Sequence, residues 1–398
     1  MLTFIATHRK FALTAQKDPH ADACPVADRY HPAVLAVRAS GILAKTCITR
    51  YPMAHTLLDQ EIHSQPDTIR AVLSQSAHTA AVAAHIITHD PYAVFIAARG
   101  TSDNAARYAQ YLFGMMLQLP VGLATPSLTT LYGVALRFRQ ALVLGISQSG
   151  RSPDICEYVA SARRQSALTV AITNKPESPL AQAAAYHLDI TAGIEQSVAA
   201  TKTYTNQLAT IALLTGHLAG DGRLLDALDE LPDVLAGVLA IPQATIDAAA
   251  QLIATGSAAM SIGRGLQYAT ALEAALKIKE LSGLPVEGYS SADVLHGPVT
   301  TVERHFPVML SGDTGVSHHD TAQLIERVRA AGARIVVASS SRDHCSAADV
   351  ALPIPVCDER LAPIATIVAW QRVAAATAAS RGRDANAPIG LHKVTETR

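Results

Sequence analysis

The chain contains the stretch Ala141-Leu142-Val143-Leu144-Gly145-Ile146-Ser147-Gln148-Ser149-Gly150-Arg151-Ser152, in which an apolar run leads directly into a hydroxyl-rich segment. A run without polar alternation predicts a strand that is covered on both faces, as in a parallel sheet. The change of composition at Ser147 predicts that the strand ends there and that a loop begins. This strand and its loop therefore favour an α/β fold with a buried sheet.

Similar apolar runs recur in two series of predicted strands, separated by longer stretches rich in alanine and leucine. The first series is Ala93–Ala98, Ala141–Ile146, Ala167–Ile172 and Tyr186–Ile190, and the second is Ala258–Ile262, Phe306–Leu310, Ala333–Ala338 and Asp349–Ile354. Corresponding strands start 163 to 166 residues apart, which indicates an internal duplication of one α/β unit. Helices are expected between the copies, around residues 205–254, and after them, around residues 361–380.

The predicted domain boundaries follow from these elements. Residues 1–52 lack sustained helical or strand periodicity, and the pattern of residues changes at Met53. Two interpretations stay open: translation starts at Met53, or residues 1–52 form a poorly ordered extension. We expect a first domain with a helical lead-in at 53–240, a second domain at 241–383 and a C-terminal tail at 384–398.

The composition narrows the class of protein. Hydrophobic residues make up 49% of the 398 residues and charged residues only 16%, which predicts extensive buried surface and argues against disorder. The net charge of −1 gives no indication of a nucleic-acid or membrane partner. The five cysteines form no C-x-x-C pair, and no long apolar run or signal peptide is evident. We therefore expect a cytoplasmic protein without disulfides or a zinc site.

Two loops at adjacent strand ends are suited to bind an anion. Residues 99–103 follow the first predicted strand, and residues 147–154 follow the second. Their hydroxyls supply donors, their glycines let the backbone approach, and parallel sheets bind ligands beyond the carboxyl ends of their strands. The simpler alternative is that these hydroxyls only cap helices. The equivalent loop of the second copy, 311–315, carries an acid and fewer hydroxyls, so we expect the anion site in the first copy.

One predicted helix carries ionisable side chains. Within Leu266–Leu281, Glu273, Lys277 and Glu280 fall in an arc of roughly 60° at about 100° per residue. A carboxylate shielded from water can act as a base on carbon, but such a stripe is also typical of a solvated helix face. His296, in the turn His296-Gly297-Pro298, is a second candidate for proton transfer near neutral pH.

Several motifs strongly resemble the double sugar-isomerase (SIS) domain family. They are Glu195–Lys202, Ser147–Gly150, Ala271–Glu280, His296–Pro298 and Lys393–Thr395, and they occur in the family's order between about residue 53 and the last residue. The resemblance implies two tandem SIS domains, each a parallel sheet flanked by helices in a doubly wound, flavodoxin-like α/β fold. The family includes the isomerase half of glutamine–fructose-6-phosphate aminotransferase.

The resemblance also implies an activity. No glutaminase half with an N-terminal cysteine nucleophile precedes the first SIS unit, and Arg99–Asn104 and Leu391–Thr395 are similar to the SIS-type glucosamine-6-phosphate deaminases. Such an isomerizing enzyme converts an amino sugar 6-phosphate and water into fructose 6-phosphate and ammonia. The synthase has Cys in place of Arg99 and Ser in place of Ala200, so the sugar contacts there are expected to differ.

Carried over to this chain, the family pattern implies a role for each site residue. Glu280 would move a proton between C1 and C2, Lys277 would orient Glu280 or the open-chain sugar, and Lys393 would lie near C2. His296 would assist ring opening in a neighbouring subunit's pocket, so a homodimer with shared active sites is expected. The residues expected to bind phosphate and sugar are Arg99, Gly100, Thr101, Ser102, Ser147, Gln148, Ser149, Ser152, Val198 and Ala200.

No metal or organic cofactor is expected, because Gly263-Arg264-Gly265 is only a fragment of a dinucleotide motif and no metal-ligand spacing occurs. Two other functions stay open. One is an isomerase or deglycase for another phosphosugar, such as galactosamine 6-phosphate or a fructosamine 6-phosphate. The other is a non-catalytic phosphosugar-sensing regulator, which the lack of a basic DNA-reading segment disfavours.

Overall fold

The computed structural model describes residues 56–391 and residue 393. These residues belong to one unit, which begins at Met53. The segment 1–52, for which two interpretations are open, lies outside the described residues. So do His392, Val394 and Thr395 of the terminal motif.

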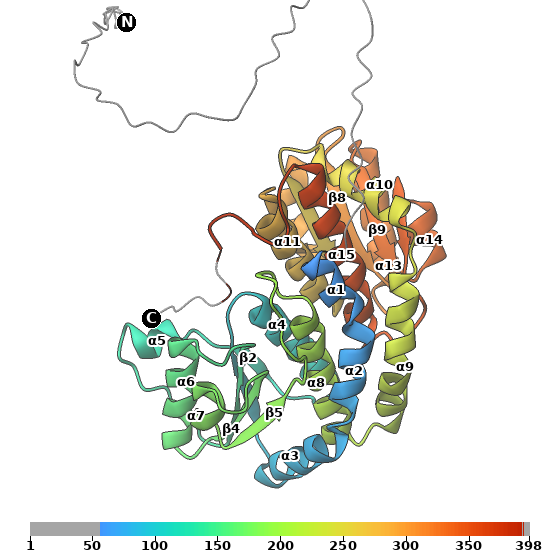
Figure 1. Cartoon of the computed structure of the whole chain (residues 1–398). Helices are drawn as coiled ribbons and strands as arrows, with labels where there is room; N and C mark the ends of the chain where they lie inside the picture. The colour runs from blue at the N-terminus through green and yellow to red at the C-terminus, as the bar shows by residue number, and fades with distance from the viewer. Residues whose placement is uncertain (1–55, 392, 394–398) are drawn as a thin grey trace, which may run out of the picture. The chain divides into compact units, whose positions relative to one another are not determined.

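Each half of the described chain contains a five-stranded sheet whose strand pairings are all parallel (Figure 1). The first sheet has the order β2-β1-β3-β4-β5, formed by Val121–Leu123, Ala93–Ala97, Ala141–Ile146, Leu168–Thr173 and Tyr186–Asp189. The second has the order β10-β9-β8-β6-β7, formed by Val350–Pro353, Arg334–Ser339, Pro307–Gly312, Ala259–Gly263 and Val286–Ser290. Both are the flavodoxin-like strand order. The predicted α/β class and the tandem doubly wound sheets are confirmed.

The sequence pattern missed the edge strands β2 and β7. They start 165 residues apart, so they belong to the same duplication. β2 has three residues, each only half-buried, and β7 includes the exposed Glu287. Short edge strands of mixed polarity lack the continuous apolar run by which buried strands are recognised.

Helices flank both sheets (Figure 1). The first copy and its lead-in contain α1 (Leu57–His63), α2 (Gln65–Leu73), α3 (Ser76–His89), α4 (Thr101–Leu117), α5 (Ser127–Thr130), α6 (Pro153–Arg164), α7 (Pro179–Ala183), α8 (Lys202–Ala219) and α9 (Gly222–Leu239). The second contains α10 (Gln243–Ala254), α11 (Gln267–Ser282), α12 (Ser291–Leu295), the 3₁₀ turn η1 (Pro298–Thr301), α13 (His318–Ala330), α14 (Arg342–Ser346) and α15 (Ala362–Ser380). The helical region predicted at 205–254 is therefore three helices, α8 to α10.

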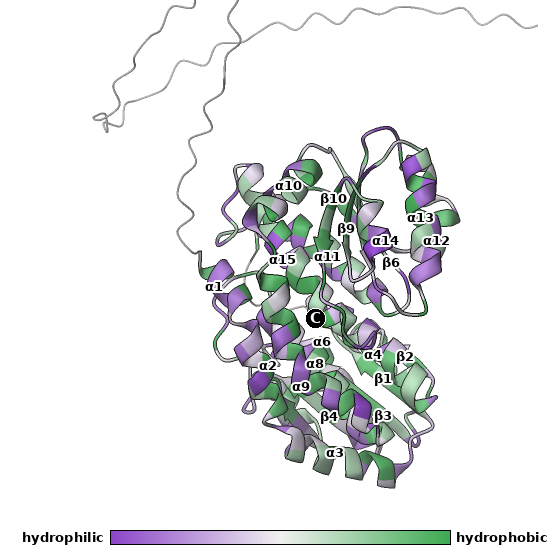
Figure 2. Ribbon diagram, turned by 90° about the vertical axis from the view of Figure 1, so that its right-hand side faces the viewer, coloured by the Kyte–Doolittle hydropathy of each residue, from purple (hydrophilic) through white to green (hydrophobic). Residues whose placement is uncertain are grey.

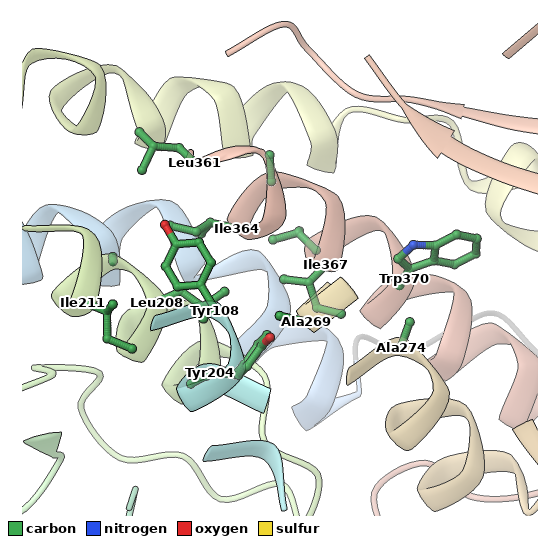
Figure 3. Close-up of a cluster of buried hydrophobic side chains, with 14 of the residues drawn as sticks. Tyr108, Tyr204, Leu208, Ile211, Ala269, Ala274, Leu361, Ile364, Ile367 and Trp370 are labelled. Carbon is green, nitrogen blue, oxygen red and sulfur yellow. The ribbon is translucent and has the colours of Figure 1, made fainter. Parts of the chain in front are cut away.

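A shared hydrophobic core joins the two copies. Helices α4 and α8 of the first copy contact α11 and α15 of the second, and side chains from all four helices meet in Figure 3. Tyr108, Tyr204, Ile364 and Trp370 are fully buried there, and burial of an aliphatic side chain such as Ile364 contributes about 1.5–3 kcal/mol of stability. Trp370 also donates from Nε1 to Ser311 Oγ at 2.9 Å. This core brings α11 of the second copy against α4 of the first.

The hydropathy of the elements agrees with this arrangement. Figure 2 shows mainly hydrophobic residues on the strands, with hydrophilic residues on outer helices such as α1 and α13. Among the residues that the structure describes, no helix combines the length and the apolar character that a membrane span needs.

Candidate active site

A cavity of about 300 Å³ opens at the carboxyl ends of β1 and β3, which is the topological switch point of the first sheet. Of the fourteen predicted site residues, only His296 is absent from its lining. The lining residues are Arg99, Gly100, Thr101, Ser102, Ser147, Gln148, Ser149, Ser152, Val198, Ala200, Thr203, Gln207, Lys277, Glu280, Leu391 and Lys393. Segments from five parts of the chain therefore meet at one place.

The loop after β1 turns sharply into α4. Gly100 has a φ of +55°, a left-handed conformation that favours glycine. The Thr101 hydroxyl donates to Glu273 Oε1 at 3.1 Å, and Gln207 Nε2 donates to Ser102 Oγ at 3.0 Å. The Ser102 hydroxyl is thus fixed as an acceptor, so its own proton is available to a ligand.

The loop after β3 holds further hydroxyls beside the N-terminus of α6. Ser147 Oγ accepts from the Gly150 backbone N–H at 3.2 Å, and Ser149 Oγ accepts from that of Arg151 at 3.3 Å. Accepting hydroxyls keep their protons for donation, which suits a phosphate oxygen. Ser152 is the N-cap residue of α6, but its side chain makes no capping hydrogen bond. The capping alternative therefore does not describe this serine.

The ionisable stripe of α11 is buried rather than solvated. The side chains of Glu273 and Lys277 are 0% and 1% exposed, and that of Glu280 is 23% exposed. Lys277 Nζ lies 3.4 Å from Glu273 Oε1 and also forms a hydrogen-bonded ion pair with Glu280 Oε2. The predicted common face of the three residues is thus present, and the solvated-face alternative is wrong.

Burial and neighbouring charges shift the protonation of this cluster. Burial raises the pKa of Glu273 from 4.5 to about 7, although Lys277 acts in the opposite direction. Burial acts to lower the pKa of Lys277, but Glu273 and Glu280 together outweigh it and raise this pKa above its ordinary value. Lys277 therefore stays protonated beside Glu280.

Lys393 of the C-terminal tail reaches the same cavity. Its Nζ donates to Glu195 Oε2 at 2.7 Å and to the Ser197 carbonyl at 2.6 Å. The buried Glu195 carboxylate also accepts from the backbone N–H groups of Thr201 and Thr203, at 2.9 and 3.2 Å, at the start of α8. One carboxylate thus connects the tail lysine to the N-terminus of a helix that lines the cavity.

A second buried glutamate positions the intervening loop. Glu61 of α1 accepts from the backbone N–H of Gln196 at 2.5 Å and of Ser197 at 3.2 Å. Satisfying two backbone donors in this way fixes a loop that makes no sheet or helix bonds of its own. Val198 and Ala200, which follow, are thereby held at the cavity.

His296 does not reach the cavity of its own chain. It is the exposed C-terminal cap residue of α12, which follows edge strand β7. The expectation that it enters a neighbouring subunit's cavity stays a prediction.

Sequence reasoning missed several residues that line or support the cavity. Thr203, Gln207 and Leu391 line it, and Asn104 Nδ2 donates to Glu273 Oε2 at 2.7 Å. The spacing of Thr203 and Gln207, four apart at the start of a helix, places them on one face and was a usable signal. The partnership of Asn104 with Glu273 joins two copies of the repeat and has no local signal.

The cavity combines anion-binding and acid–base groups. Three cations line it, Arg99, Lys277 and Lys393, and each contacts at least one carboxylate. Serine hydroxyls and a helix N-terminus favour an anion, while Glu280 beside Lys277 can accept or donate a proton. Within 56–391 and 393, no group of three His, Cys, Asp or Glu side chains is placed to hold a metal ion.

Comparisons with protein-family models and with known proteins indicate the same family. A family model described as the SIS domain matches residues 86–215 and 254–379. An isomerizing glutamine–fructose-6-phosphate aminotransferase of Gloeobacter violaceus is 33% identical over 350 residues, which cover 84% of this chain and 57% of the relative. The chain thus spans little more than half the length of that relative.

Solved structures share the fold. A protein of Silicibacter pomeroyi DSS-3 described as a phosphosugar isomerase is 36% identical with a TM-score of 0.75, over 83% of this chain and 99% of that one. A glucosamine-6-phosphate deaminase of Thermotoga maritima has a TM-score of 0.68 over 86% of this chain and all of that one. At 19% identity, the second likeness supports the fold alone.

Proposed function

Because the chain belongs to the SIS domain family, we propose that it is an enzyme that converts glucosamine 6-phosphate and water into fructose 6-phosphate and ammonia. The observation that carries the proposal is the meeting of phosphate-type loops with an acid–base cluster at one cavity. Neither part alone would favour an enzyme, since hydroxyl-rich loops also bind regulatory ligands.

The proposed reaction begins with the open-chain aldehyde. Glu280 removes the proton from C2 and returns a proton to C1. O1 gains a proton and the nitrogen on C2 loses one, which gives a C1 alcohol and a C2 imine. Water then adds to C2, ammonia leaves, and the C2 ketone of fructose 6-phosphate remains. General acid–base steps of this kind contribute about 10²–10⁴-fold each.

The neighbouring cations serve this chemistry. Lys277, held protonated between two carboxylates, orients Glu280 and stabilises the negative charge that develops on the substrate. Lys393, fixed by Glu195 and the Ser197 carbonyl, is assigned to C2, where the imine forms. His296 of a second subunit is assigned to ring opening, so the active enzyme is proposed to be a homodimer.

Binding of the non-reacting phosphate would align the reacting carbons of the sugar with the acid–base residues. The hydroxyls of Ser147, Ser149 and Ser152 and the N-terminus of α6 are assigned to the 6-phosphate. Binding energy gained there holds C1 and C2 beside Glu280.

The test is to incubate the protein with glucosamine 6-phosphate and to measure ammonia and fructose 6-phosphate together. Equal amounts of both products support the proposal. If neither product forms but galactosamine 6-phosphate is turned over under the same conditions, the proposed substrate is wrong and the proposed type of reaction is kept.

One observation favours a second candidate function. A further cavity of about 330 Å³ shares Gln148, Ser149 and Lys393 with the first and is also lined by Arg151 and Lys175. Glu177 and Glu195 also line it, so the cavity offers room and charges of both signs for a zwitterion, such as the amino acid released from a fructosamine 6-phosphate. A deglycase would release that amino acid and a sugar phosphate, which chromatography of the products distinguishes from ammonia release.

A further inference from the structure

The two copies share an arginine–aspartate pair in addition to their strand order. In each copy, an Arg-Gly dipeptide follows the first strand, and an aspartate lies in the first turn of the helix after the third. Arg99 pairs with Asp154, and Arg264 pairs with Asp320. The two arginines are 165 positions apart, so the pairs occupy equivalent places in the repeat.

The two pairs differ in burial and geometry. The Asp154 side chain is 2% exposed, and its Oδ2 accepts from both Nε and Nη2 of Arg99 at 2.8 Å. The Asp320 side chain is 51% exposed and lies 3.3 Å from Nε of Arg264. Burying a carboxylate is costly unless it is paired and hydrogen-bonded. The tighter pair belongs to the copy that has the cavity.

The surroundings of the second pair do not suit an anion. Leu266 occupies the position equivalent to Thr101, and Asp313 occupies the position equivalent to Gln148. The carboxylate of Glu359 accepts from the Val316 backbone N–H at 3.0 Å in the same loop region. Leu266 offers no donor to an anion, and the carboxylates of Asp313 and Glu359 repel one.

We infer that Asp154 is a positioning residue that holds Arg99 for the anionic group of the ligand. A guanidinium has five N–H groups, and the pair with Asp154 engages two of its nitrogens. Arg99 is 49% exposed and lines the cavity, so the donors that Asp154 does not engage are accessible to a ligand there. The inference rests on the proposed function only in taking the anionic group to be the 6-phosphate.

The carboxylate itself is fixed to α6. Its Oδ1 accepts from the Ile155 backbone N–H at 2.9 Å, so both oxygens of Asp154 are engaged. The pair therefore connects the loop after β1 to the helix N-terminus beside Ser152. Because both loops line the cavity, the orientation of Arg99 is set relative to the serine hydroxyls rather than by solvent.

A role limited to connecting the loops predicts a different result. It would lower stability and kcat together, because the whole site would loosen. A role in holding Arg99 predicts weaker binding of phosphorylated ligands with chemistry preserved, since the phosphate is remote from C1 and C2. The split between KM and kcat therefore separates the two roles.

The experiment uses Asp154→Asn, which keeps the side-chain shape and the acceptor for Ile155 but removes the charge that orients the guanidinium. We expect the Kd of fructose 6-phosphate, measured by calorimetry, and the KM for glucosamine 6-phosphate to rise about 5- to 20-fold, with kcat within about twofold. Asp320→Asn is the matched control in the other copy, and both constants should stay within about twofold of wild type.

Three outcomes overturn the inference. They are an unchanged Kd in Asp154→Asn, a joint loss of stability and kcat in Asp154→Asn, and an equal rise of Kd in Asp320→Asn. If thermal melting shows that Asp154→Asn does not fold, Arg99→Lys is measured instead. This variant keeps the positive charge but loses the planar guanidinium with its paired donors. An unchanged Kd of fructose 6-phosphate in Arg99→Lys therefore overturns the inference as well. A wild-type protein that binds fructose 6-phosphate but releases no ammonia contradicts the proposed function and leaves the inference standing.

Discussion

Lys277 and Glu280 form an ion pair on one face of α11, with Lys277 buried and Glu280 partly exposed at the cavity. Glu273, one turn earlier, contacts the same ammonium from the buried side. The lysine therefore separates two carboxylates with different environments. One is open to a ligand, and the other is open only to protein.

Replacing Glu280 with Gln tests its proposed role as the base. We expect kcat to fall about 10²–10⁴-fold while the Kd of fructose 6-phosphate changes less than about threefold, because shape and hydrogen bonding are largely kept. Lys279→Gln is the control on the same helix, since Lys279 is exposed and is not among the residues that line the cavity. Undiminished turnover in Glu280→Gln would remove Glu280 from the mechanism. A wild type that binds phosphosugars but turns over none would favour the sensing regulator.

Replacing Glu273 with Gln should change how stability depends on pH. Burial raises the pKa of Glu273 from 4.5 to about 7, so between these values the folded protein holds a proton that the unfolded chain has released. The wild type therefore loses stability as pH rises through this window, by on the order of 1–3 kcal/mol. Denaturant unfolding at pH 5 and pH 8 should show a smaller loss in Glu273→Gln.

A matched control for this measurement is Glu326→Gln on the exposed side of α13. Its unfolding free energy should follow the wild-type curve between the same two pH values. If the unfolding free energy of Glu273→Gln changes with pH as that of the wild type does, the ionisation of Glu273 does not cause the loss of stability between pH 5 and pH 8.

The buried strands were predictable because each is a continuous apolar run with a change of composition at its end. β3 has the predicted bounds, Ala141–Ile146, and its loop carries the predicted hydroxyls. The cavity residues that follow strand ends could be predicted for the same reason, since parallel strands deliver their loops to one edge. Residue identity and chain order were sufficient for this part of the site.

The supporting contacts could not be predicted in the same way. Asp154 is the last residue of one predicted loop and Arg99 the first of the other, but they are 55 positions apart and nothing in either loop indicates that they pair. Glu61 lies in the lead-in helix and bonds backbone atoms of residues 196 and 197. These pairs depend on how the helices pack against the sheet. The order of apolar and polar residues along the chain does not indicate that packing.

Gly150→Ala should destabilise the loop after β3 through a specific clash. Gly150 has a φ of +62°, and a Cβ there would lie 2.2 Å from Ser178 Oγ. Gly133 has a nearly equal φ of +63° with nothing within 4 Å of its added Cβ, so Gly133→Ala reports the backbone strain alone. We expect Gly150→Ala to lower the free energy of unfolding by about 1–2 kcal/mol more than Gly133→Ala.

The same pair of variants reports on ligand binding. Gly150→Ala should also raise the KM for glucosamine 6-phosphate, because the Ser147 and Ser149 hydroxyls are positioned by this turn. Equal stability of the two variants, measured by denaturant unfolding, would show that the Ser178 side chain moves aside without lowering the free energy of unfolding.

Mixing two inactive variants tests whether His296 serves a neighbouring cavity. Glu280→Gln damages the cavity of its own subunit, whereas His296→Ala would damage the cavity of its partner. After exchange of subunits in an equal mixture, half of the dimers are mixed, and each mixed dimer has one cavity with both groups intact. Activity should therefore recover to about a quarter of wild type. If His296 acts within its own chain, every cavity in the mixed dimer carries one lesion, and the mixture stays as inactive as either variant alone.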